Sequence, residues 1–369
     1  MTLTRRDVLG GTAASVIAYG CGPNTDLGLT SASTYDEVIA ALYKTDLEFG
    51  NYGNHGPMVA DALVALEREE RVAEWVQKYE RSVPMRPTAG GLDASQWTAS
   101  LGKYDKRAGW IATFEASLKA GPPKHVVREW FPLLAPGLSG ALWHGLIRTA
   151  HAVRSFERKD TEARRMEFAH GLGWWASRYL PLPGVPGARP MPGRTVLTAL
   201  QETPLVPTSA RVFTDNEVLR YPSLNGRTEF IDAVETVDLK AQSPEDAVTA
   251  LVNAAARLFV HHGQRDIILL HVITGSSVMR LLLSWLERAD QERAVGYLFQ
   301  SVAATYATYA PSTKSLDPVA PPAKTVDALV ATAKESGDAH SIKLGEATRR
   351  EHALRGDTDV VAALNSWLG

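Results

Sequence analysis

Histidine is the residue type in this chain with the most specific chemistry, because a neutral imidazole can bind a metal ion or transfer a proton. The 369-residue sequence contains ten histidines. It has no H-E-x-x-H and no H-x-H pair, so no short motif defines a metal site by itself. Whether the histidines form one site therefore has to be judged from their positions on the expected helices.

Four histidines and one lysine lie where a buried site could form. His55 of NHGPM stands at the entry of an expected helix, and His144 of WHGLIR lies close to an apolar stripe. His271 is inside IILLHVITG, the most apolar run after the first 21 residues, where an imidazole needs a hydrogen-bond partner or a metal ion. His340 and Lys343 are three residues apart, which places both on one face of a helix.

Two interpretations of these histidines stay open on placement alone. A single buried histidine is more often a hydrogen-bonded core residue than a metal ligand. Four of them on separate segments, each beside glycine or another small residue, indicate a shared metal site. The alternatives are thus one metal centre or four structural histidines.

The stretches NHGPMVADALVAL, WHGLIRTAHAV, LLHVITGSS and DAHSIKL together resemble the questin oxidase-like family, in this order and over most of residues 34–354. Members of that family include fungal enzymes that oxidatively open anthraquinone-type rings, with Baeyer–Villiger-like outcomes. In one branch the resemblance implies a non-haem iron centre held by four histidines and a carbamylated lysine. Carried over to this sequence, it implies that Fe(II) is bound by His55, His144, His271, His340 and Lys343.

The resemblance leaves the roles of some residues open. His151, about two helical turns after His144, is a reserve ligand or a neighbour of the ligands. Lys343 can bind metal only after it loses its proton and adds CO2, and the alternative is a surface lysine paired with Glu346. We expect the remaining histidines to end a helix in water or to be ordinary surface or core residues: His261 and His262 in the first group, His125, His170 and His352 in the second.

Aromatic and basic residues near these motifs could shape a substrate pocket. Arg148, one turn after His144, could meet a substrate carboxylate or phenolate, or pair with an acidic residue such as Asp61. Four aromatic residues could line a dry pocket or simply pack in the core: Trp143, Trp174, Trp175 and Tyr52.

The expected function is O2-dependent oxidation of an aromatic or quinone-like small molecule, by an oxygenase with Baeyer–Villiger-like or ring-cleaving chemistry. The alternatives are an exported helical binding protein with structural histidines and a metal-dependent hydrolase with a carbamylated lysine. Relatives are often described as using NADPH. This chain has no G-x-G-x-x-G after a strand, so it gives no support for a tightly bound nucleotide, and the need for NADPH stays open.

Helical periodicity dominates the elements that must position these residues. It predicts an all-α fold, one large domain over residues 34–369 with helical halves at 34–179 and 208–369, joined by a Pro-rich crossing segment. IILLHVITG could be a buried strand, but it continues into a helical pattern and is interpreted as a helix. Among the predicted helices are 34–48, 58–81, 138–156, 266–288 and 338–354.

The first 21 residues, with paired arginines, a short run of small apolar residues and Cys21, look like a twin-arginine export signal, and residues 22–33 read as a linker. The sequence therefore predicts a periplasmic protein that contacts the membrane only through a candidate lipid anchor at Cys21. A net charge of -2 gives no basic surface for nucleic acid, and one cysteine excludes cysteine-based metal motifs.

Overall fold

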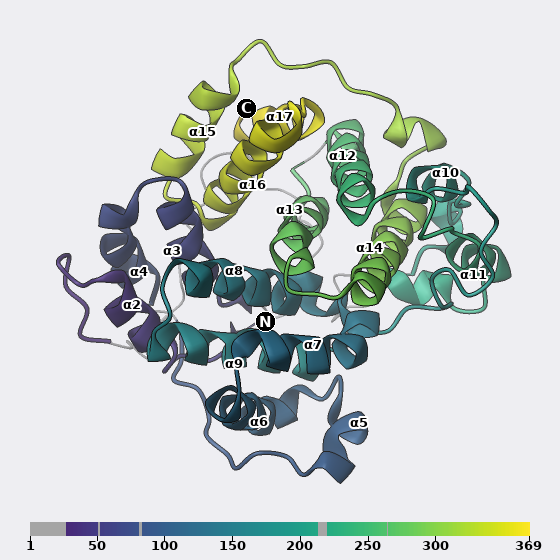
Figure 1. Cartoon of the computed structure of the whole chain (residues 1–369). Helices are drawn as coiled ribbons and strands as arrows, with labels where there is room; N and C mark the ends of the chain where they lie inside the picture. The colour runs from purple at the N-terminus through teal and green to yellow at the C-terminus, as the bar shows by residue number, and fades with distance from the viewer. Residues whose placement is uncertain (1–26, 51, 81–82, 213–219, 264) are drawn as a thin grey trace.

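The computed structural model describes residues 27–50, 52–80, 83–212, 220–263 and 265–369. The predicted export signal and the first part of the predicted linker lie outside these residues. The all-α fold is confirmed, with helices α2 to α17 forming nearly all of the regular structure (Figure 1). Within the described residues the only strands are β1 (Glu48–Phe49) and β2 (Tyr52–Gly53), which form a short antiparallel hairpin.

Two long neighbouring helices, α8 (His144–Arg158) and α9 (Glu162–Ser177), lie across the centre of the molecule (Figure 1). On one side α6 (Arg107–Ala120) packs on α9, with α5 (Trp97–Ser100) and α7 (Pro123–Leu134) next to it. On the other side α8 packs on α13, so α8 connects the earlier and the later parts of the chain.

The later helices form the second layer of the fold. Helix α13 (Ile267–Leu283) is the buried helix predicted from IILLHVITG, and it packs against α12, α14 and α16. Helix α15 packs on α16 and α17, and α10 and α11 lie against α14. The bounds of these helices are Val196–Gln201 for α10, Thr228–Glu235 for α11, Pro244–His262 for α12, Arg288–Tyr309 for α14, Val326–Glu335 for α15, Ala339–Arg355 for α16 and Asp359–Leu368 for α17.

The first helices are shorter than their periodicity predicts. Helix α2 (Tyr35–Leu42) starts at the Thr34 cap, where Thr34 and Glu37 form a capping box, and it stops well before residue 48 because the chain turns into the hairpin. The predicted helix 58–81 is broken into α3 (Gly56–Ala65), the 3-10 turn η1 (Glu69–Arg71) and α4 (Val72–Glu80). The first break comes after Leu66, because the next residue, Glu67, adopts a left-handed backbone conformation with φ of 61°.

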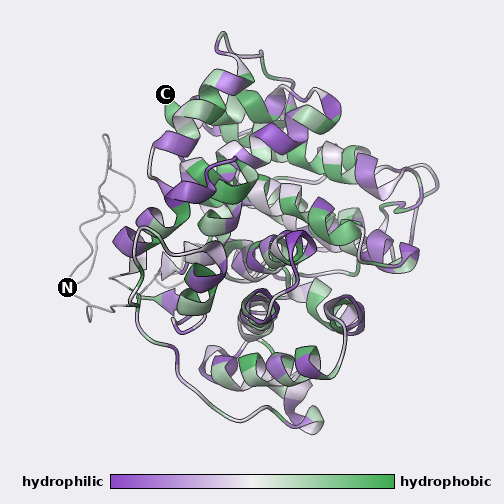
Figure 2. Cartoon of the chain, turned by 60° about the vertical axis from the view of Figure 1, so that its left-hand side comes forward, coloured by the Kyte–Doolittle hydropathy of each residue, from purple (hydrophilic) through white to green (hydrophobic). Residues whose placement is uncertain are grey.

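One continuous cluster of buried apolar side chains runs from Tyr35 in α2 to Leu364 in α17. Most helices carry hydrophobic and hydrophilic residues on different sides, as Figure 2 shows by colour, and the hydrophobic sides face this core. Over the part of the chain that the structure describes, no helix combines the length and the apolar character needed to cross a bilayer.

Candidate metal centre

The helices bring five of the predicted site residues together from four separate segments. His55 is the residue at the N-terminal cap of α3, His144 is the first residue of α8, and His271 lies in the second turn of α13. His340 and Lys343 lie in the first turn and a half of α16. We call these five side chains the donor cluster.

Three imidazoles of the donor cluster are close enough to share one ion, and the His144 ring lies beside them. Nε2 of His55 is 2.8 Å from Nε2 of His144, and the ring centroids of His55 and His340 are 4.7 Å apart. The ring of His271 has its centroid 4.7 Å from that of His144 and 5.1 Å from that of His340. One nitrogen from each of His55, His271 and His340 lies within 4.8 Å of the other two.

The donor cluster is buried, and several of its polar atoms make no hydrogen bond. His271 is 1% exposed and Lys343 is 2% exposed, whereas the side chain of His340 is 15% exposed. Among the described residues, Nε2 of His271, Nε2 of His340 and Nζ of Lys343 have no hydrogen-bond partner. Such an unsatisfied buried group costs about 1–3 kcal/mol, so three of them in one place indicate that a bound species normally satisfies them.

Burial keeps the four imidazoles uncharged and makes the Lys343 amine easier to deprotonate. Desolvation, and then the neighbouring Lys343 and imidazoles, hold the pKa values of His55 and His271 well below their ordinary range. The pKa values of His144 and His340 are lowered in the same way. Burial also lowers the pKa of Lys343 to about 7, against the weaker opposite effect of Asp338. Neutral imidazoles and a deprotonated amine have the lone pairs that metal binding requires.

Backbone carbonyls orient two of the rings. Nδ1 of His271 donates to the carbonyl oxygen of Ile267 at 2.6 Å, which leaves Nε2 without a proton and free to bind a cation. The ring of His144 hydrogen-bonds the carbonyl of Ala141. This pairing of one ring nitrogen with a carbonyl is how metal-binding histidines are commonly held.

The indole of Trp174 covers one face of the His144 ring. The two rings are nearly parallel, at 6°, with centroids 4.8 Å apart, and Nε1 of Trp174 donates to Glu48 in the hairpin at 2.7 Å. Position 53 of the same hairpin requires glycine, because the backbone there lies so close to two rings that a Cβ would be 2.8 Å from Trp174 and 2.9 Å from His144. The hairpin therefore packs closely against both Trp174 and His144.

A left-handed turn precedes His144. Ala141, Leu142 and Trp143 have φ values of 47°, 55° and 58°, within the 3-10 segment η5 (Gly140–Trp143). Residues with a Cβ rarely adopt this conformation, and three in succession are unusual. The helix predicted over 138–156 is wrong at this point, because α8 begins only at His144. Strain of this kind tends to occur at functional sites.

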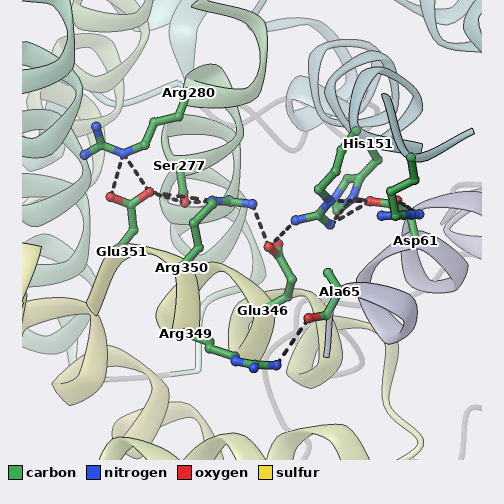
Figure 3. A network of polar contacts seen from close by, with 11 residues as sticks. Asp61, Ala65, His151, Ser277, Arg280, Glu346, Arg349, Arg350 and Glu351 are labelled. Carbon is green, nitrogen blue, oxygen red and sulfur yellow. Dashed lines mark hydrogen bonds and ion pairs between the residues drawn. The ribbon is translucent and has the colours of Figure 1, made fainter. Parts of the chain in front are cut away.

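A buried network of charged groups is carried by the same helices as the donor cluster, and Figure 3 shows this network. Its centre is Asp61 of α3, which is 1% exposed and accepts hydrogen bonds from three side chains of α8: His151 at 2.7 Å, Arg154 at 2.6 Å, and Arg158. Burial alone would raise the pKa of the Asp61 carboxyl, but Arg154 and its neighbours hold that pKa well below the usual range. Asp61 is therefore a charged, fully paired carboxylate.

The network continues from α8 into the later helices (Figure 3). Arg154 also donates to Glu346 of α16, which accepts a second hydrogen bond from Arg350 at 2.6 Å. Arg350 donates to Ser277 of α13 at 2.7 Å, and Ser277 donates to Glu351 at 2.6 Å. The network thus joins α3, α8, α13 and α16, the same four helices that carry the donor cluster.

Three predicted contacts are wrong or only partly right. His151 does not join the other imidazoles but bonds Asp61, so it is a neighbour of the site rather than a fifth ring in it. Arg148 pairs with Glu167, at 2.9 Å between Nη2 and Oε2, and not with Asp61, because Arg154 and Arg158 occupy Asp61. The alternative of a surface Lys343 paired with Glu346 is also wrong, since Lys343 is buried.

The aromatic residues predicted to line a pocket divide into different environments. Only Trp174 contacts the donor cluster; Trp175 packs edge-on against Phe131 in the core, and Tyr52 is 54% exposed. Trp143 is buried beside Gly275.

The other histidines behave as surface or core residues. His125 is exposed, His261 is exposed and bonds the carbonyl of Asp317, and His262 ends α12 in a half-buried position. His352 bonds the carbonyl of Asp357, and the fully buried His170 contacts Arg148.

Two residues that sequence reasoning missed contact the segments that carry ligands. The Tyr79 hydroxyl accepts a hydrogen bond from the backbone nitrogen of His55 at 2.7 Å, and the Trp75 indole donates to the carbonyl of Gly337 at 2.8 Å. The spacing of four in WVQKY places Trp75 and Tyr79 on one face of a helix, but nothing in the sequence says what that face contacts.

The chain matches the questin oxidase-like family over residues 65–348. This range contains His144, His271, His340 and Lys343, and it begins after His55. A comparison with curated proteins gave no match. Because the matched range covers more than half of the 369 residues, the chain is a member of the questin oxidase-like family.

Proposed function

We propose that this protein is an O2-dependent oxidoreductase with a non-haem iron centre, which oxidises an aromatic or quinone-like small molecule in a Baeyer–Villiger-like or ring-cleaving reaction. Membership of the questin oxidase-like family indicates an oxygenase acting on aromatic compounds. The observation that carries the iron proposal is the set of unsatisfied donor atoms on His271, His340 and Lys343, buried beside the facing nitrogens of His55 and His144.

The chemistry of the donor set fits ferrous iron. Imidazole nitrogen is a good ligand for Fe(II), and the four rings come from four helices, so they can approach one ion from different directions. When bound, iron would supply the redox and Lewis-acid chemistry that lets O2 react with an aromatic ring.

Lys343 has the environment needed for carbamylation. Its neutral amine can form a C–N bond to CO2, which gives a carbamate and releases one proton. The carbamate would offer an anionic oxygen where Nζ now has no partner. A negatively charged oxygen ligand would also favour the ferric state of the metal over a set of neutral imidazoles alone. Lys343 is thus proposed as the fifth ligand, in its carbamylated form.

The remaining residues of the site would exclude water and fix ring orientation. Burial of His144 and His271 keeps bulk water from the donors, and the carbonyls of Ala141 and Ile267 hold these two rings in the protonation form that can bind metal. Trp174 presents a flat apolar surface against His144. An apolar, dry surrounding suits the binding of an aromatic substrate.

The two rival functions make different predictions about the same donors. Structural histidines in an exported binding protein have no reason to converge, whereas the unsatisfied nitrogens of His271 and His340 lie in one cluster with Nζ of Lys343, which favours a shared ligand. A hydrolase with a carbamylated lysine would use the same residues with zinc or nickel. The need for NADPH is a separate question that the same assay answers.

The test is metal analysis of the purified protein, followed by removal of metal with a chelator and addition of Fe(II) or Zn(II) to separate samples. We expect about one iron per chain, and O2 uptake with a hydroxyanthraquinone probe in the Fe(II) sample alone, because zinc has no redox chemistry. Incorporation of 18O into the probe, with and without NADPH, identifies the reaction class and the reductant.

Two outcomes would overturn the proposal. If the chain binds no divalent metal at all, the histidines are structural. If zinc or nickel fills the site and the iron-loaded protein consumes no O2 with any quinone or phenol probe, the hydrolase is the better assignment.

A further inference from the structure

Helix α4 contributes no donor, yet its side chains bond the backbone of the two segments that carry His55 and His340. Its residues Trp75 and Tyr79 are one turn apart, and their rings stack with centroids 4.9 Å apart at an angle of 19°. We call this stacked pair the α4 clasp. Its polar atoms bond the backbone of the two segments that lead into α3 and α16.

Tyr79 fixes the segment that carries His55. Its hydroxyl accepts from the backbone N–H of His55 at 2.7 Å and donates to the carbonyl of Gly53 at 3.2 Å. His55 is at the N-terminal cap of α3 and its side chain makes no capping hydrogen bond. The Tyr79 hydroxyl therefore bonds both the residue itself and the end of the hairpin before it, which limits how His55 can move relative to α4.

Trp75 fixes the segment that carries His340. Its indole donates to the carbonyl of Gly337 at 2.8 Å, where the chain turns from α15 into α16 with φ of 72°. Asp338 follows as the cap of α16, and His340 lies two residues further on. Arg71, the last residue of η1, adds a hydrogen bond to the carbonyl of Lys334 in the last turn of α15 at 3.0 Å, so the start of α4 is also held close to this turn.

The rings of His55 and His340 are the ones that most need such support. His144 and His271 each have a carbonyl partner, but the nearest carboxylate to Nδ1 of His340 is Asp338 at 4.0 Å, too far for a hydrogen bond. Nε2 of His340 has no partner, and its side chain is the most exposed of the four. The backbone that the clasp holds therefore helps to set their relative placement, together with the contact of His55 with His144 and that of His340 with Trp367.

We propose that Trp75 and Tyr79 are positioning residues that set the separation of His55 and His340, and thereby the affinity and geometry of the metal centre. The inference rests on the metal centre of the proposed function. It extends the site to a helix with no ligand, through three hydrogen bonds to backbone atoms. Partners that hold metal ligands in place commonly change metal affinity about 10- to 100-fold when they are removed.

The experiment replaces only the polar atoms of the clasp. In Tyr79→Phe and Trp75→Phe the aromatic rings stay and the hydrogen bonds are lost. Tyr52→Phe removes a hydroxyl from the exposed hairpin residue, and Trp97→Phe removes an indole bond of the same kind, to the carbonyl of Leu92, away from the donor cluster. Each protein is stripped of metal and titrated with Co(II), whose visible spectrum reports ligand geometry, and its unfolding by urea is followed with and without Co(II).

The expected result is a loss of Co(II) affinity of about 10- to 100-fold in each clasp variant, with a changed visible spectrum. Tyr52→Phe and Trp97→Phe should bind Co(II) like the wild type. The double clasp variant should lose little more than either single one, because the separation of the two rings is already free once one tether is gone. A purely structural role would lower the urea midpoint equally with and without Co(II), whereas a positioning role lowers the stabilisation that Co(II) adds.

Failure of the clasp and failure of the metal centre are distinguishable. If the wild type binds Co(II) and both clasp variants bind it within about twofold with the same spectrum, the clasp has no positioning role while the metal centre stands. If the wild type binds neither Co(II) nor Fe(II), both inferences are overturned.

Discussion

The donor cluster and the charged network lie side by side on α3, α8, α13 and α16, yet they satisfy their polar groups in opposite ways. In the network the buried carboxylates of Asp61, Glu346 and Glu351 each accept from at least two side chains. In the donor cluster, Nε2 of His271 and Nζ of Lys343 accept from none and donate to none.

The difference shows which buried polar groups the protein pairs with its own side chains and which it leaves without a partner. Buried charges are tolerated only when they are paired, and the network meets this condition between helices that are far apart in sequence. The donor cluster is also buried but has no such pairing; its imidazoles stay neutral instead, and burial lowers the pKa of Lys343 to about 7. We infer that the network fixes the four helices and that the cluster is completed by a cation.

The largest expected effect comes from breaking the network at Asp61. Asp61→Asn would leave Arg154 and Arg158 buried or half-buried without their shared carboxylate, and we expect the free energy of unfolding to fall by about 3–5 kcal/mol. Urea unfolding of the metal-free protein measures it. Asp36→Asn is the control, because Asp36 pairs with Arg164 and Lys159 nearer the surface and should cost about 1 kcal/mol or less. Equal effects of the two variants would contradict the role given to the network.

Removing one donor tests the other region. His271→Gln should weaken Co(II) or Fe(II) binding by at least about 100-fold. Loss of a residue that only supports a metal ligand weakens binding by up to about 100-fold, and loss of a ligand itself should cost at least as much. It should change the stability of the metal-free protein by only about 1 kcal/mol, because Nε2 of His271 has no partner and only the bond of Nδ1 to the Ile267 carbonyl is lost. Its matched control is His170→Gln, since His170 is also buried with an unpaired Nε2 but lies against Arg148. Metal binding unaffected by His271→Gln would remove that ring from the site.

Lys343→Met should separate stability from function. Methionine is of similar size and carries no buried amine, so we expect the metal-free protein to gain about 1–3 kcal/mol, the usual cost of an unsatisfied buried polar group. Iron affinity and any carbamate signal in the mass spectrum or the 13C spectrum with 13CO2 should be lost. Lys119→Met, at an exposed position in α6, is the control and should change neither quantity. A destabilised Lys343→Met protein would argue that the amine has a structural partner.

The two regions should also respond differently to pH. The cluster imidazoles have pKa values below the ordinary 6.5, so below about pH 6.5 the unfolded chain takes up protons that the folded chain does not, and stability falls by at most about 1.4 kcal/mol per pH unit and ring. The network stays charged over this range, because the pKa of Asp61 is lowered and that of Arg154 is raised.

The measurement is the urea midpoint of metal-free protein between pH 5 and pH 8. The stability of a double variant with His271→Gln and His340→Gln should fall less steeply with decreasing pH than that of the wild type. The difference in slope is the contribution of the two missing rings. His151 and His170 also have lowered pKa values and remain in both proteins, so they do not affect the difference. Identical curves would mean that the two rings are protonated in the folded state.

The helical fold was largely predictable, because amphipathic periodicity depends on neighbouring residues alone. The buried helix around His271 was predicted, and the structure confirms it. Among the boundaries that were missed are those after Leu42 and before His144. In the first the hairpin competes with a weak helical pattern, and in the second Ala141 to Trp143 adopt a conformation that their residue types disfavour.

The donor residues could be proposed from the sequence because four short motifs resemble a known family, and the structure brings all five side chains together. Their supporting contacts could not be predicted. Asp61 and Arg154 are 93 residues apart, and the Trp75 indole meets a carbonyl 262 residues away, so only tertiary packing determines these pairs. A charge inside an apolar helix, such as Asp61, is a signal of burial and pairing, but it does not say with which residue.

The left-handed turn at Ala141–Trp143 has a consequence for how this chain can vary in length. Loops usually tolerate insertions, because their exact path matters little. Here the turn leads directly into the first residue of α8, and each residue added to or removed from a helix rotates the later side chains about the helix axis by about 100°. One extra residue that shifted the start of α8 would aim His144 away from the other rings, so we expect relatives that keep this histidine to keep the spacing before it as well.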